Sequence, residues 1–141
     1  MPAKRHNPFK LSAFHGVDPA QVERLAAQGI KSAEALLTAG RTPQQRAALA
    51  ASAGIPEQAV LELVQLSDLA RLPGVKGIRA RLYYEAGVDS VEKLATWEPE
   101  ALRIMVTEYV ARTGFGGVPP LPKEVSSTVA NAQRLPKAVE Y

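Results

Sequence analysis

Residues 71–82 form the segment of this chain best equipped for chemistry, because two glycines stand among basic side chains and no acidic one. Its basic residues are Arg71, Lys76, Arg79 and Arg81. Gly74 allows backbone angles that side chains forbid, and Gly77 lets the next helix begin close to the turn. The backbone N–H groups that follow, together with the positive end of a helix, would form an anion site, and phosphate is the commonest anion to fill one.

The predicted binding site is built on this turn. Its residues are Gly74, Val75, Lys76, Gly77, Arg79 and Arg81. The glycines shape the turn, Val75 anchors it in the core, the N–H groups from Lys76 to Arg79 meet phosphate, and the three basic side chains add charge. A second concentration of charge lies in residues 1–10, an expected flexible basic arm with Lys4, Arg5 and Lys10. Basic residues also decorate ordinary solvated helix faces, and that interpretation stays open.

Composition excludes several other chemistries. The chain has 141 residues, 46% of them hydrophobic and 6% aromatic, with a formal net charge of +3 and no cysteine. Disulfide scaffolds, thiolate zinc sites, iron–sulfur clusters and cysteine nucleophiles are therefore ruled out. The residues provide no specific Ser/His/Asp set, metal-ligand cluster or Walker-type loop, so we expect neither enzyme activity nor a cofactor or metal.

The chain is predicted to be all-helical, because apolar residues recur at three- and four-residue spacing between proline and glycine breaks. The predicted helices run from 19 to the stop at 29, 32 to 40, 43 to 54, 56 to about 70, 77 to 87, 99 to about 112, and 123 to 134, with a short sixth helix before residue 99. Thr42 and Gln45 predict a capping box, and either Asp89 or Ser90 caps the sixth helix. A Gly/Pro-rich hinge precedes the last helix, and an extended tail follows it.

Two parts of the chain match each other at an offset of 58 residues, which predicts an internal duplication. The identical pairs are Gly16/Gly74, Val17/Val75, Gly29/Gly87, Ser32/Ser90, Glu34/Glu92, Leu36/Leu94 and Thr38/Thr96. The predicted copies span 14–40 and 72–98 within a domain of residues 11–112, and residues 113–141 pack on that domain. Chance similarity between two Gly-ended helical hairpins is the alternative explanation.

The second copy resembles the helix-hairpin-helix family in Leu72-Pro73-Gly74-Val75 and in Ala80. It departs from the family pattern at Lys76, which stands where the second glycine is usual. The first copy, His15-Gly16-Val17-Asp18-Pro19, is more degenerate and looks structural. The resemblance implies tandem helix-hairpin-helix-like (SAM-like) units joined by connecting helices, of which often only one binds the DNA backbone.

A second resemblance covers residues 11–141. The capped Thr-Pro helix, the segment Asp68 to Val75, the segment Ala86 to Val91 and the closing Ala132 to Pro136 look like a bacterial family, number 4332 among the domains of unknown function. That resemblance implies a fold and a nucleic-acid role through the hairpins, and it implies no established activity.

We therefore expect a non-enzymatic, cytoplasmic protein that binds nucleic acid, most readily DNA, without sequence specificity. A membrane partner is not expected, because no apolar stretch approaches the roughly 18 residues that a spanning helix needs. The alternative is a protein-interaction module that uses the apolar helix around residues 60–69, the hinge and the tail. Tyr83 could stack on a base, but helical spacing favours a core position opposite Leu25.

Overall fold

The computed structural model describes residues 8–141, and within them the chain forms eight α-helices and no named strand. The helices are α1 (Pro19–Ala27), α2 (Ala33–Ala39), α3 (Pro43–Ala53), α4 (Glu57–Leu69), α5 (Gly77–Glu85), α6 (Val91–Ala95), α7 (Pro99–Thr113) and α8 (Pro122–Arg134). A short 3-10 turn, η1 (Leu11–Ala13), precedes them. The all-α prediction is confirmed, and every predicted helix is present.

Local sequence explains where the helices begin. The Asp18 side chain accepts a hydrogen bond from the Ala20 N–H at the start of α1. Thr42 and Gln45 form the predicted capping box at α3, each side chain accepting from the other residue's backbone N–H. Ser90, rather than Asp89, caps α6 by accepting from the Lys93 N–H at 3.1 Å. Such caps satisfy backbone donors that have no partner inside the helix.

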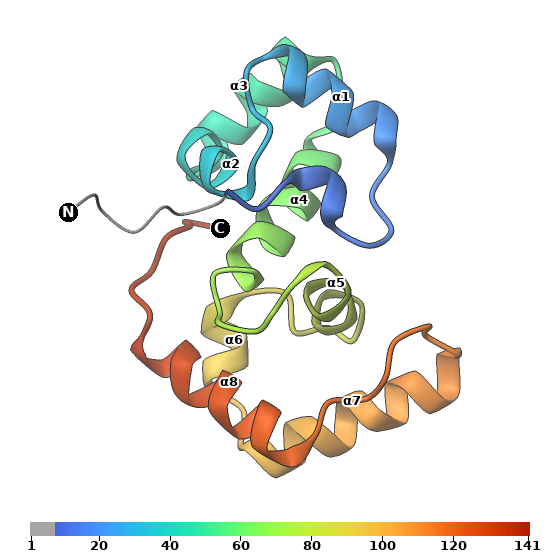
Figure 1. Ribbon diagram of the computed structural model, residues 1–141. Coiled ribbons are helices and arrows are strands. Elements are labelled where there is room, and N and C mark those ends of the chain that lie inside the picture. Colours follow the sequence, from blue (N-terminus) through green and yellow to red (C-terminus); the bar gives the residue numbers. More distant parts are fainter. Residues whose placement is uncertain (1–7) are drawn as a thin grey trace, which may run out of the picture.

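The central element is α4, which packs against α2, α3 and α5. Figure 1 shows α1, α2 and α3 at one end of the molecule, α7 and α8 at the other, and α4 between them. Val60, Val64, Leu66 and Leu69 of α4 are all fully buried. The apolar helix considered above as a docking surface is therefore the centre of the core.

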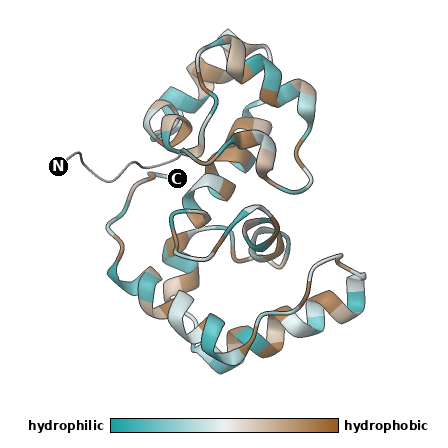
Figure 2. Cartoon of the chain, viewed as in Figure 1, coloured by the Kyte–Doolittle hydropathy of each residue, from teal (hydrophilic) through white to brown (hydrophobic). Residues whose placement is uncertain are grey.

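The other end of the molecule is built by α8, which packs on both α6 and α7. Hydrophilic and hydrophobic residues alternate along α8, as Figure 2 shows, and the buried ones include Val125, Val129 and Ala132. Apolar residues at this helical spacing form one face, which covers the core while the opposite face meets solvent.

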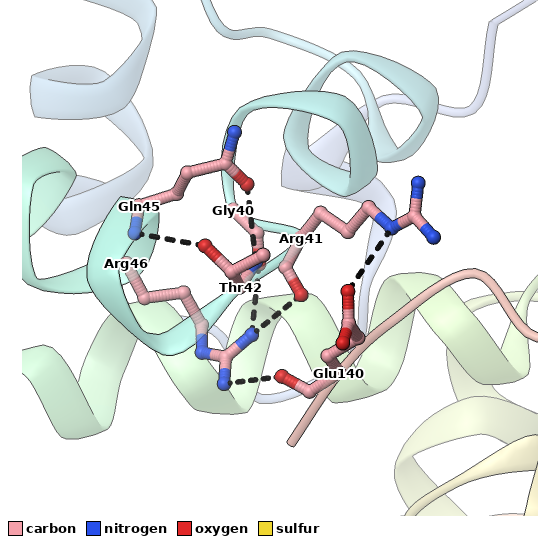
Figure 3. A network of polar contacts seen from close by, with 6 residues as sticks. All are labelled: Gly40, Arg41, Thr42, Gln45, Arg46 and Glu140. Atoms are coloured by element: carbon pink, nitrogen blue, oxygen red, sulfur yellow. Dashed lines mark hydrogen bonds and ion pairs between the residues drawn. The ribbon is translucent and has the colours of Figure 1, made fainter.

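The tail after α8 crosses back to the first half of the chain and is fixed there. The guanidinium of Arg46 donates to the carbonyl oxygens of Gly40, Arg41 and Glu140, as Figure 3 shows. The Glu140 N–H donates to the Arg41 carbonyl at 2.9 Å, and Val139 is only 1% exposed. The tail thus joins the N-terminal helices to α8.

Among residues 8–141, no single helix is long and apolar enough to cross a membrane. The pair α3 and α4 meets the criteria of length and composition only when taken together, across a bend of 120°.

Candidate nucleic-acid interface

The turn before α5 has the geometry that its glycines require. Gly74 lies at φ +82°, in the left-handed region that favours glycine. The Val75 side chain is 2% exposed, and its N–H donates to the Leu72 carbonyl at 3.0 Å. Lys76 is the N-cap residue of α5, and its side chain forms no capping hydrogen bond. The side chain is exposed beside the first turn of the helix.

The corresponding turn of the first segment has a similar backbone. Gly16 lies at φ +79°, and the glycines that end the two following helices, Gly29 and Gly87, lie at +83° and +96°. Ser32 accepts from the N–H three residues on, as Ser90 does in the second segment. The backbone therefore follows the same course at positions 58 residues apart.

The two turns contact each other directly. The His15 N–H donates to the Gly77 carbonyl at 3.3 Å. A β-carbon added at Gly77 would overlap the carbonyl oxygen of Ala13, so the first residue of α5 is pressed against the backbone of the first turn. The φ angle of Gly77 is not positive, so its conformation does not require glycine. Glycine is needed at this position because the two backbones approach too closely for a side chain.

The arginines of the predicted site all have partners inside the protein. Arg79 donates to the Glu124 carboxylate, with the closest pair of atoms 2.5 Å apart, and to the carbonyl of Val118. Arg81 is 4% exposed and pairs with Glu62 at 2.8 Å. In the same segment Arg71 pairs with Asp68 at 2.7 Å. The basic segment is therefore largely neutralised by acids from other helices.

The Arg79–Glu124 pair also changes the acidity of the carboxyl group. The hydrogen bond from Arg79 holds the pKa of Glu124 below its ordinary value of 4.5. Tyr83 lies beside this pair, and burial is the main reason why its pKa is raised to about 12, with the Glu124 charge adding to the effect. Tyr83 and Leu25 are both fully buried, which confirms that Tyr83 is a core residue.

Three exposed lysines lie at the turn before α5 or near the Phe9–Leu11 segment. Lys76 is exposed, and its ammonium group lies 6.0 Å from the centre of the Phe9 ring. Lys10, next to Phe9, forms an antiparallel bridge with Ser32, and the Leu11 N–H donates to the Lys31 carbonyl at 3.1 Å. Lys10, Lys31 and Lys76 form no ion pair with any residue between 8 and 141. We call these three residues the lysine cluster.

Part of this cluster was predictable. Lys76 and Lys10 were expected from the sequence, whereas Lys31 was missed because it follows the helix of the first copy, outside both basic segments. The 58-residue offset gave no signal for it, because the equivalent residue of the second copy is Asp89. Lys4 and Arg5 lie outside the described residues.

A groove adjoins the lysine cluster at the start of α5. Its volume is about 750 Å³, and its lining residues are Ala13, Gly74, Lys76, Gly77, Ile78, Arg79, Gly116, Gly117, Val118 and Glu124. The Gly/Pro loop between α7 and α8 thus forms one wall, and the predicted turn forms the other. Ile78 is 48% exposed and Val118 75% exposed, so the groove presents apolar side chains to solvent.

Other acidic residues have structural roles. Glu98 accepts from the N–H groups of Glu100 and Ala101 at the start of α7, and Glu100 pairs with Arg103. In the part of the chain that the structure describes, no group of three or more His, Asp or Glu side chains is placed to hold a metal ion.

Comparison with known proteins identifies a family and gives no further relative. No curated protein matches the chain. No solved structure matches it either. A family model described as "Domain of unknown function (DUF4332)" matches residues 15–135.

Proposed function

The chain belongs to the DUF4332 family, and from this premise we propose that it is a non-enzymatic protein that binds nucleic acid, DNA in particular, without sequence specificity. The proposed contacts are to backbone phosphates at the turn before α5. The lysine cluster supplies the charge, and Gly74, Val75 and Gly77 shape the turn.

We further propose that residues 14–40 and 72–98 are tandem helix-hairpin-helix-like units. Support comes from the matched left-handed glycines and serine caps at equivalent positions of the two segments. In this proposal only the second unit meets phosphate. The first turn has the carboxylate of Asp18 at the start of its helix, which would repel an anion.

The observation that carries the proposal is the lysine cluster. Lys10 and Lys31 lie where the Phe9–Leu11 segment contacts residues 31–33, and the Lys76 ammonium at the start of α5 lies near the Phe9 ring. Among residues 8–141 none of the three forms an ion pair, although the Glu34 carboxylate accepts from the Phe9 N–H nearby. An exposed lysine is a mobile point charge suited to the phosphate backbone, which carries the largest share of non-specific affinity. Arg79 and Arg81 have no direct role in this proposal, because their guanidinium groups have partners inside the protein.

The protein-interaction alternative loses two of the three features on which it first rested, and it keeps the Gly/Pro hinge. The helix at residues 60–69 belongs to the core, and the tail is held by Arg46 and by the burial of Val139. What remains for that alternative is the apolar groove, and the experiments below separate the two functions.

The test is a fluorescence-anisotropy titration of the whole protein with a labelled DNA duplex. Three phosphate contacts predict an affinity that falls about 40-fold between about 50 and about 200 mM salt. Replacing all three lysines (Lys10→Gln, Lys31→Gln and Lys76→Gln) should remove most of the binding and most of its salt dependence. Lys137→Gln is the control for the loss of one positive charge elsewhere on the surface, because Lys137 is an exposed lysine of the tail.

Two results would overturn the proposal. One is the absence of binding at the lower salt concentration. The other is equal binding by the triple variant, once circular dichroism has established that the variant is folded.

A further inference from the structure

The groove beside the lysine cluster has a lining that phosphate contacts do not explain. Two of its exposed side chains, Ile78 and Val118, are aliphatic, and most of the other lining residues are glycine or alanine. Its volume of about 750 Å³ lies in the range of about 300–1,000 Å³ that is usual for sites that take up small ligands. A surface used for phosphate alone has no need of exposed apolar side chains.

Aromatic rings lie on both sides of the same region. Phe9, over which Lys76 lies, is half-buried and packs on the core residue Phe14, with 4.8 Å between the ring centres. On the loop side, the Phe115 ring is 6.1 Å from His15 and 6.5 Å from Tyr109. His15 is exposed, and Phe115 packs beneath Gly117, a residue of the groove wall. The half-buried rings of Phe9 and Phe115 therefore lie near Lys76 and near the wall of the groove, respectively.

This combination of groups favours one form of nucleic acid. A duplex buries the faces of its bases and offers the protein mainly phosphates and groove edges. A single strand offers phosphates and also the flat faces of unstacked bases, which gain from contact with apolar and aromatic side chains. The carboxylate of Glu124 lies in the groove, but it is held by Arg79, which reduces its repulsion of a polyanion.

We propose that the preferred ligand of this surface is a single-stranded nucleic acid, whose phosphates contact the lysine cluster and whose bases enter the groove between Ile78 and Val118. This inference rests on the function proposed above and specifies its ligand. Because every base has a flat face, binding of this kind tolerates any sequence.

The experiment compares three labelled probes of one length by fluorescence anisotropy: a single DNA strand, the duplex of the same sequence, and a single strand without bases. The whole protein should bind the single strand about tenfold more tightly than either of the other two, since each base contact is absent from both. The probe without bases separates base contacts from the greater flexibility of a single strand.

A double variant, Ile78→Ser with Val118→Ser, tests the groove itself. We expect it to lose about tenfold in affinity for the single strand and to leave duplex binding unchanged. Ile104→Ser is the matched control, because Ile104 is 46% exposed, as Ile78 is 48% exposed, but lies on α7 outside the groove. Both replaced side chains are exposed, so the variants should fold, and thermal unfolding followed by circular dichroism checks this.

The possible outcomes separate the two proposals. Equal or tighter binding of the duplex, or full affinity for the strand without bases, overturns the single-strand inference and leaves phosphate binding in place. Retention of single-strand affinity by the double variant overturns the role of the groove. Failure of all three probes to bind overturns both proposals and leaves the groove to a protein partner.

Discussion

The Arg81 side chain of α5 donates a hydrogen bond from Nε to the backbone carbonyl oxygen of His15, at 2.6 Å. The same guanidinium pairs with Glu62 of α4, and a β-carbon added at Gly16 would lie 3.0 Å from Nε. One buried side chain thus ties the first turn, α4 and α5 together. An arginine that the sequence assigned to phosphate instead joins the two hairpin segments.

Arg81→Met should therefore destabilise the protein without weakening nucleic-acid binding. Removing one partner of a buried pair leaves the His15 carbonyl and the Glu62 carboxylate without their donor, at a cost of about 3 kcal/mol. Urea unfolding measures the loss, and anisotropy at a temperature where the variant is folded measures binding. Reduced affinity at unchanged stability would show that Arg81 contacts the ligand.

Gly77→Ala should reduce the free energy of unfolding by about 2 kcal/mol or more, because the added methyl group has no room beside the Ala13 backbone. Gly116→Ala is the control, since a β-carbon there meets nothing within 4 Å and the backbone angle of Gly116 is not positive. Equal stabilities for the two variants, compared by urea unfolding, would contradict the close contact between the turns.

Asp68→Ala should cost about 3 kcal/mol in stability. This carboxylate is 1% exposed and accepts from the Arg71 guanidinium, the Val91 N–H and the Tyr141 hydroxyl. It therefore joins the end of α4 to α6 and to the tail. Asp89→Ala breaks only the partly exposed pair with Lys93 and should cost less than about 1 kcal/mol. Thermal unfolding measures the stability of both variants. A larger loss for Asp89→Ala than for Asp68→Ala would contradict the role of Asp68 in joining α4, α6 and the tail.

Stability should fall in acid partly through Glu124. Its pKa is lower in the folded protein than its ordinary value of 4.5, because Arg79 donates to the carboxylate. The stabilisation is therefore complete above about pH 4.5 and is lost as the pH falls through the lowered pKa. The Glu124 side chain is 36% exposed, so solvent screening keeps the effect below about 1 kcal/mol.

Urea unfolding of the protein and of Glu124→Gln between about pH 3 and about pH 7 measures this contribution. The difference in stability between the two proteins should shrink toward acid pH. A difference that is constant over the whole range would mean that the Arg79–Glu124 pair does not contribute through ionisation.

The sequence by itself determined the secondary structure and the shape of the turns. Helix starts at Asp18, Thr42 and Ser90 depend on side chains that reach backbone groups only two or three residues away. The left-handed angle of Gly74 likewise follows from the residue type within one turn. These features are local, so composition and spacing are enough to predict them.

Only the tertiary structure decided which charges of the predicted site are free. Arg79 meets Glu124 at a separation of 45 residues, and Arg81 meets His15 at a separation of 66. Lys31 comes beside Lys10 only because the chain returns there to form a bridge. A long side chain pairs with whatever group the packing of distant helices brings within reach, and local sequence carries no record of that partner.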